Sequence, residues 1–360
     1  MDSKENYFIS IIIPIFNSED HIRRCLNNLI NQSLDNIEIL CVDYGSEDNS
    51  IEIIKEYSYE HNHVKLFSSD SNINAARNKG ILNSNGEYLL FLNPMDWMHV
   101  NSCENIYNEI KEKSYDILFF KSSLFNDVDN SIYEDENDLE LVYNIVENNT
   151  INHLDINNLI FSLPYPCYNK IYNRSFLKDN NLCFLENNFS EYSFFYKVIL
   201  NANKLKIYNK HIYIKKIIPN EYIEYEDIFD DLVNMIYIFK ELCFYDRYEK
   251  DLLNYQMDMF KYYLENSDSF KDSVYTLIRN IFIFIEEQKS IYARYATNLN
   301  SENIFFFRNI LKTNSFNEYE LLCQYNKIIN ENENLKFQIS NLKREVTSLN
   351  NKISKLENKS

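Results

Sequence analysis

The chain has 360 residues, 45% of them hydrophobic and 25% charged, which is enough for one large α/β domain with an accessory region or for two modest domains. Its formal net charge of −18 argues against nucleic acid as a partner, because phosphate binding requires a surplus of Lys and Arg, and against purely electrostatic binding to an anionic membrane. No apolar run reaches about 18 residues and no signal-peptide core is present, so we expect a cytoplasmic protein, at most peripheral at the inner face of the membrane.

The first hundred residues alternate between apolar, β-branched runs and segments with helical spacing. The apolar runs predict strands buried on both faces, and they lie at 7–16, 37–42, 64–67 and 88–92. Helices are predicted between these runs, from an N-cap at Asn17 or Ser18, at 51–57 and at 73–82. This alternation predicts an α/β fold with a doubly wound, mostly parallel sheet that binds ligands at the carboxyl ends of its strands.

Polar residues gather where three of these strands end. The clusters are Asn17 to Glu19, Asp43 to Ser46, and Asn93 to Asp96. No GxGxxG follows the first strand, which argues against a dinucleotide-binding site. The seven cysteines are scattered and form no CxxC pair, so we expect reduced thiols instead of disulfides or a zinc site.

From about residue 225 to 320 the pattern is helical and strongly aromatic. One predicted helix carries its apolar residues on a single face, namely Ile228, Leu232, Met235, Ile236 and Phe239. Two further apolar stretches, 281–285 and 305–307, leave two interpretations open: a helix that faces a membrane, or burial against the sheet domain or a dimer partner. We favour burial, because large exposed apolar patches are rare on soluble proteins.

The last forty residues contain a heptad repeat. Apolar residues alternate by four and three at Leu335, Ile339, Leu342, Val346, Leu349, Ile353 and Leu356. Ile and Val occupy the a positions and Leu occupies the d positions, a combination that favours a parallel two-stranded coiled coil. The pairs Glu331–Lys336 and Lys352–Glu357 would join opposite charges between the two chains. We therefore predict a parallel homodimer; the alternative is a single amphipathic helix that docks on its own domain.

Four segments resemble the opening of family 2 glycosyltransferases, which have the GT-A fold. They are ISIIIPIFNSE at 9–19, ILCVDYGSEDNS at 39–50, NAARNKG at 74–80 and NGEYLLFLNPMDW at 85–97. The resemblance continues more weakly through 164–177, 188–200 and 210–216. It implies a GT-A glycosyltransferase-like domain at 1–220. The helical pattern and the heptad repeat then predict a helical accessory region at 221–320 and a coiled-coil dimerisation segment at 321–360.

The resemblance implies a nucleotide-sugar donor, most often a UDP-sugar, and transfer with inversion to a hydroxyl of a growing glycan. In the family, a turn after the first strand packs on the base, and Pro14 and Phe16 take its place here. Asp43 matches the acid that hydrogen-bonds to the base, and Arg77 lies where a cation can approach the diphosphate. The other residues assigned to the nucleotide pocket are Glu19, Gly45 and Ser46.

The catalytic half departs from the family pattern in two places. The family's Asp-x-Asp-Asp-Trp loop holds a divalent metal, Mn²⁺ or Mg²⁺, but its two metal positions are Asn93 and Met95 here, and only the following Asp96 is acidic. These metals prefer hard, anionic oxygens, so any metal bound by Asn93 and Asp96 is expected to be held weakly. The family's general base corresponds to Tyr192; since tyrosine has a pKa near 10, we assign that role to the neighbouring Glu191, with Glu186 as the other acid at hand.

Two functions therefore remain open. The first is an active glycosyltransferase that moves a sugar from a UDP-sugar to a glycan or lipid-linked glycan acceptor in surface polysaccharide or glycoconjugate assembly. Asp96, Asn93, Arg77 and Lys170 would neutralise the leaving diphosphate, and Glu191 and Asp96 are the catalytic candidates. The second is a degenerate relative that acts as a nucleotide-sugar-binding or scaffolding dimer. We favour the first.

Overall fold

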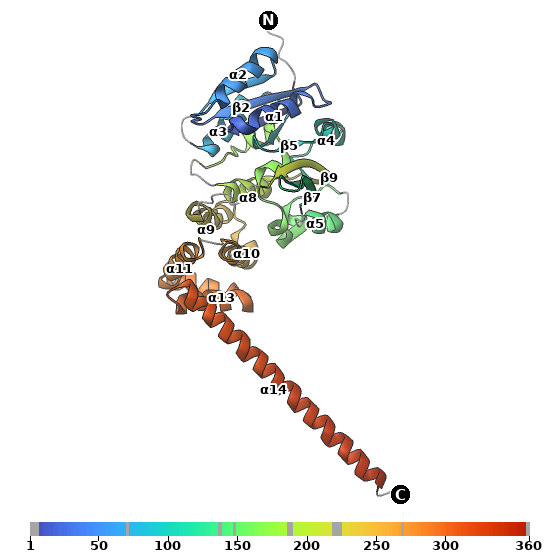
Figure 1. The fold of residues 1–360 in the computed structure, drawn as a ribbon, viewed down its shortest axis with the longest axis vertical. Coiled ribbons are helices and arrows are strands. Elements are labelled where there is room, and N and C mark those ends of the chain that lie inside the picture. Colours follow the sequence, from blue (N-terminus) through green and yellow to red (C-terminus); the bar gives the residue numbers. More distant parts are fainter. Residues whose placement is uncertain are drawn as a thin grey trace. The chain divides into compact units, whose positions relative to one another are not determined.

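The computed structural model describes residues 7–69, 72–135, 139–146, 149–185, 190–217, 225–267 and 270–357 (Figure 1). The chain forms two compact units, Met1–Leu252 and Leu253–Ser360. Helix α9 (Tyr225–Glu241) packs against helix α8 (Glu191–Asn201) within the first unit. The domain boundaries at residues 220 and 320 stay a prediction.

The first unit contains one nine-stranded sheet and the helices that cover it, as far as the described residues show. Its strands are β1 (Ile9–Ile15), β2 (Ile37–Asp43), β3 (Val64–Ser68), β4 (Tyr88–Phe91), β5 (Trp97–Met98), β6 (Ile117–Asn126), β7 (Ser131–Glu134), β8 (Lys170–Asn173) and β9 (Leu205–Lys216). Its helices, besides α8 and α9, are α1 (Glu19–Ile30), α2 (Ser50–Glu60), α3 (Ile73–Asn83), α4 (Ser102–Ile110), α5 (Leu139–Val146), α6 (His153–Ile156) and α7 (Arg174–Asp179). Short 3₁₀ turns lie at Asn157–Ser162 and Cys167–Asn169.

The sheet is mixed in direction, with the strand order β3-β2-β1-β4-β8-β6-β9-β5 and β7 paired to β6. The first four strands in this order are parallel to their neighbours, as the sequence predicted. The next strand, β8, runs antiparallel to both β4 and β6. The α/β fold is thus confirmed, while the mostly parallel pairing is limited to β1–β4 and the β6–β9 pair.

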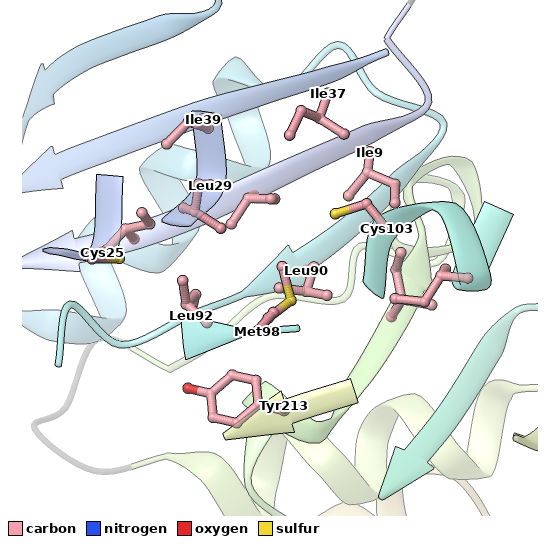
Figure 2. Close-up of a cluster of buried hydrophobic side chains, with 14 of the residues drawn as sticks. Ile9, Cys25, Leu29, Ile37, Ile39, Leu90, Leu92, Met98, Cys103 and Tyr213 are labelled. Atoms are coloured by element: carbon pink, nitrogen blue, oxygen red, sulfur yellow. The ribbon is translucent and has the colours of Figure 1, made fainter. Parts of the chain in front are cut away.

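Strands β1, β2 and β4 are buried along their whole length and pack with helix residues in the core. Odd-numbered residues of β1, from Ile9 to Ile15, join a buried cluster with Cys25 and Leu29 of α1 (Figure 2). The opposite face of β1 meets α3, where a Cβ on Gly80 would lie 2.3 Å from a side-chain carbon of Ile12. Glycine at this position therefore lets helix and strand approach closely. The carboxyl edge of the sheet is in this way held rigidly.

The second unit is helical. Helix α10 (Tyr245–Glu265) leads into α11 (Lys271–Glu287), α12 (Lys289–Asn298), α13 (Ser301–Lys312) and α14 (Phe316–Glu357). Phe282 packs against Phe306 and Phe307, with ring centroids 5.7 and 4.6 Å apart. Phe282, Phe306 and Phe307 are thus buried against each other, while Phe284 and Phe305 of the same stretches are 60% and 44% exposed. Among the described helices, none has the length and apolar content needed to cross a bilayer.

Helix α14 runs for 42 residues away from the α11–α13 cluster (Figure 1). Along it, large apolar side chains at heptad spacing are more than half exposed, namely Leu321, Tyr325, Ile328, Leu335, Ile339 and Leu342. The heptad positions from 345 onwards lie outside the described side chains. A single chain therefore leaves a stripe of apolar residues on this helix exposed to solvent.

Candidate active site

The three predicted polar clusters meet at one edge of the sheet. Strands β1 and β2 are parallel, with Ile15 opposite Asp43. Strand β4 pairs with β1 on its other side, so the loop that starts at Leu92 leaves from the same edge. Parallel strands bring their carboxyl ends together, which is why the sequence pattern located this site.

The loops after β1 and β2 are fastened to each other by polar side chains. The backbone N–H of Asn17 donates to Ser46 Oγ at 3.0 Å, and Asn17 Oδ1 accepts from the N–H of Glu47 at 2.8 Å. Asn17 has a φ of 44°, in the left-handed region that Asn tolerates. Ser46, assigned to the nucleotide pocket, thus has a structural contact that fixes the two loops.

Two other residues assigned to the pocket support the backbone. Glu19 Oε2 accepts from the backbone N–H and the side-chain amide of Asn49, at 3.0 and 2.7 Å. Pro14 is buried inside β1 opposite Val42, beyond Ile12, the last residue that pairs with β4. Because β1 no longer pairs with β4 at Pro14, the missing N–H costs no ladder hydrogen bond there. Glu19 and Pro14 therefore shape the site without facing it.

Asp43 closes the turn after β2. Its carboxylate accepts from the N–H groups of Gly45 and Ser46, at 3.1 and 3.2 Å. Gly45 has a φ of 117°, a conformation that side chains rarely adopt. A carboxylate has about four acceptor positions, so Asp43 keeps capacity for a donor such as a base N–H.

An aromatic surface lies beside this turn. The rings of Phe16 and Tyr44 stack with centroids 5.2 Å apart and planes inclined by 15°. Phe16 is 49% exposed, although a large apolar ring gains by burial. A flat, solvent-facing ring next to Asp43 matches what a planar base would need for stacking.

The predicted phosphate-binding cation and the predicted base form a buried ion pair. Arg77 Nη2 donates to Glu191 Oε1 at 2.6 Å, and the two side chains are 6% and 13% exposed. Arg77 also donates to Asn74 Oδ1 at 3.2 Å, and its guanidinium lies over the ring of Phe184. Its buried Nε–H has no acceptor within the described parts of the chain. Arg77 and Glu191, predicted for two different roles, are thus in direct contact.

Two further residues were considered at the position of the base, Tyr192 and Glu186. Tyr192, at the position of the family's acid, is fully buried and stacks on Tyr165 with centroids 4.0 Å apart. Glu186 lies outside the described residues. Glu191 is thus the acid that the described structure brings to the site beside Arg77.

The loop after β4 is tied into the protein through Asp96. Asp96 is 1% exposed and accepts from Tyr213 Oη at 2.5 Å, from the N–H of Lys216 at 2.8 Å and from Asn93 Nδ2 at 3.1 Å. Burial raises the pKa of Asp96, although these hydrogen bonds oppose the rise. Both carboxylate oxygens of Asp96 therefore accept hydrogen bonds from protein donors. The contribution of Asp96 to the site is to hold Tyr213 and the backbone of Lys216 in β9.

Asn93 and Asp96 do not fit the divalent metal that the family resemblance implied. The Asn93 amide points its N–H toward the carboxylate that would have to bind the metal. A guanidinium already lies at this loop, because Arg24 donates to the carbonyl of Met95 at 2.5 Å. No group of three or more His, Cys, Asp or Glu that could hold a metal occurs in the described part of the chain. Hard cations need several free oxygens, and this loop does not offer them.

Strand β9 contributes site residues that the sequence analysis did not assign. Tyr213 stacks on Tyr168 with centroids 5.0 Å apart, and Lys215, two residues on, places its ammonium 5.6 Å from the centre of the same Tyr168 ring. Residues two apart share one face of a strand, so Tyr213 and Lys215 point to the same side as Asp96. The alternation of polar and apolar residues in 211–216 was the feature of the sequence that could have identified these site residues.

Lys170, expected to neutralise the diphosphate, is fully buried instead. Its ammonium donates to Asn169 Oδ1 and to the carbonyl of Pro166, between the rings of Phe119 and Phe195. Burial lowers the pKa of Lys170 to about 7. Its role is in the core, because no part of the side chain reaches solvent.

Comparison with known proteins agrees with this arrangement. The glycosyl transferase family 2 model matches residues 10–179. Glycosyltransferase GlyA of Streptococcus pneumoniae is 36% identical over 126 residues, 35% of this chain and 18% of that protein. Poly(ribitol-phosphate) beta-glucosyltransferase of Bacillus spizizenii is 32% identical over 184 residues, 49% of this chain and 26% of that protein. The chain thus spans about a fifth to a quarter of the length of these two relatives.

A solved structure shows the same fold. The crystal structure of S. aureus TarS 1-349 in complex with UDP has a TM-score of 0.58 and 19% identity, and the match covers 85% of this chain and 90% of that one. The segment that matches the family model contains strands β1 to β8 and Arg77, while Glu191 of α8 and Tyr213 and Lys215 of β9 lie beyond it. Residues 10–179 of this chain thus match glycosyl transferase family 2, and the fold is the one seen in TarS 1-349.

Proposed function

We propose that this chain transfers a sugar from a UDP-sugar to a hydroxyl of a glycan or lipid-linked glycan, with inversion, in the assembly of a surface polysaccharide or glycoconjugate. The observation that carries the proposal is the buried Arg77–Glu191 pair at the edge where Asp43 and Phe16 also lie. The TarS structures were determined with UDP and with UDP-GlcNAc, which supports a uridine donor.

The proposed reaction needs one base and a stabilised leaving group. Glu191 takes the proton from the acceptor hydroxyl. The oxygen of that hydroxyl attacks the anomeric carbon of the sugar from the face opposite the diphosphate. The bond from that carbon to the diphosphate oxygen breaks, and UDP leaves with the electron pair. Phe16 stacks on the base and Asp43 accepts a hydrogen bond from it. The guanidinium of Arg77 supplies positive charge beside the diphosphate.

The test is turnover of a panel of UDP-sugars, with acceptor or water, in Mn²⁺ and in EDTA. We expect product from at least one donor, and a similar rate in both buffers because the loop at Asn93 and Asp96 does not fit a metal. Binding of UDP without turnover of any donor would overturn the proposed activity. It would favour the nucleotide-sugar-binding or scaffolding dimer.

Lys215 is expected to replace part of the charge that a metal would supply. Its ammonium lies over Tyr168 at the site and forms no ion pair with any described residue. The neighbouring Lys216 is instead paired with Asp127 at 2.5 Å. Lys215→Ala should lower kcat/KM by about 10-fold or more, because a cation at the leaving diphosphate stabilises the transition state. Lys216→Ala is the matched control, measured with the same donor, and equal losses for the two variants would contradict the assignment.

The exposed stripe on α14 supports the predicted parallel homodimer. A second copy would cover Leu335, Ile339 and Leu342 and bring Glu331 close to Lys336 of its partner. Replacing Leu335 and Leu342 by Asp should convert the dimer to a monomer, as measured by light scattering. Ser340→Asp, at an outer heptad position, is the control and should leave the mass unchanged. A monomeric unmodified chain would refute the prediction.

A further inference from the structure

Glu191 is the first residue of α8, and the N-terminus of that helix is capped from another helix. The residue at the N-cap position, Ser190, makes no capping hydrogen bond with its side chain. The carboxylate of Asp231, in α9, accepts instead from the N–H of Tyr192 at 2.9 Å and from the N–H of Ser193 at 3.2 Å. It also accepts from the hydroxyl of Ser193.

The residue that makes this contact, Asp231, is unusual in its position along the chain and in being a buried acid. Asp231 is fully buried and lies outside residues 10–179, the segment that matches the family. It is also the one buried acid among the apolar residues of α9, such as Leu232 and Met235. A buried carboxylate is costly unless donors surround it, and helix N–H groups are suitable donors because the helix dipole is positive there.

We propose that Asp231 is a positioning residue for Glu191: by capping α8 from α9, it fixes the helix end on which the catalytic carboxylate is carried. The inference rests on the role of Glu191 as the base in the proposed function. Three donors of α8 hold Asp231, and Arg77 holds Glu191. The first turn of α8 is thereby fixed by the hydrogen bonds to Asp231 and by the ion pair with Arg77.

Loss of the cap should misplace the base without removing it. A displacement of about 1 Å in a catalytic group can lower the rate by about 100-fold. We therefore expect Asp231→Ala to lower kcat by about 10-fold to 100-fold, with little change in the KM for the donor. Asp231→Asn should recover most of kcat, because its carbonyl oxygen can still accept from the two N–H groups. Asp230→Ala, on the exposed face of the same helix, is the matched control.

Assays above pH 7 keep Asp231 ionised, since burial raises the pKa of this carboxyl to about 7. Hydrogen exchange at the amides of Tyr192 and Ser193 is measured in parallel and should be faster in Asp231→Ala than in the unmodified chain. An unchanged kcat, or equal losses of kcat in the Ala and Asn variants, would overturn the positioning role.

Failure of the proposed function has a different signature. In that case the unmodified chain would show no turnover, or Glu191→Gln would be as active as the unmodified chain. Hydrogen exchange at the amides of Tyr192 and Ser193 still tests whether Asp231 caps α8. Unaltered exchange in Asp231→Ala would overturn the inference, and faster exchange at these amides alone would support it.

Discussion

Glutamine in place of Glu191 is expected to lower kcat by about 10²-fold to 10⁴-fold, the usual effect of removing a general base. Gln keeps an oxygen that can accept from Arg77, so the ion pair becomes a hydrogen bond between a charged guanidinium and a neutral amide, and the contact is kept. The loss should therefore fall on kcat, with the KM for the donor little changed. Steady-state kinetics with the preferred UDP-sugar measures both quantities.

Glu60→Gln is the control for this substitution, because Glu60 is an exposed residue at the end of α2. It should leave both constants unchanged. A Glu191→Gln variant with full activity would mean that another group, such as a residue of segment 186–189, takes the proton. The assignment of Glu191 as the base would then be wrong.

Leucine in place of Arg77 is expected to destabilise the protein by about 3 kcal/mol, because it leaves the carboxylate of Glu191 buried without its partner. Urea unfolding of the unmodified and variant proteins measures the difference. The double variant Arg77→Leu, Glu191→Leu should be more stable than Arg77→Leu alone, since it removes the unpaired charge as well.

Arg23 and Glu56 provide a matched pair for comparison. They form a salt bridge of 2.8 Å, but their side chains are 53% and 60% exposed. Solvent screens such a pair, so Arg23→Leu should hardly change the unfolding midpoint. Equal effects at Arg77 and Arg23 would contradict the view that burial makes the Arg77–Glu191 pair important.

Local patterns in the sequence were sufficient to predict the strands and helices of the first half of the sheet. The apolar run at 37–42 became β2 (Ile37–Asp43), and the helix predicted at 73–82 became α3 (Ile73–Asn83). In β2, burial on both faces makes almost every residue apolar, which the sequence shows directly. Strands β6, β8 and β9 were not assigned, because their pairing depends on partners far along the chain.

The errors at the site have a similar cause. Lys170 was expected at the diphosphate because lysine is cationic, but the sequence does not show that Phe119 and Phe195 enclose it. Asn93 and Asp96 were assigned to the metal by comparison with the family, position by position. The hydrogen bond between their side chains depends on the fold, so the sequence did not show it. Asp231 did leave a local signal: it is an acid on the apolar face of a predicted helix, a position where a buried partner is expected.

The central claim is that this edge of the sheet binds a nucleoside diphosphate with side chains of the protein and without a divalent metal. Calorimetric titration of the unmodified chain with UDP, once in EDTA and once in Mn²⁺, tests it most directly. The claim predicts the same Kd in both buffers. Binding that occurs only with Mn²⁺, or no binding in either buffer, would contradict it.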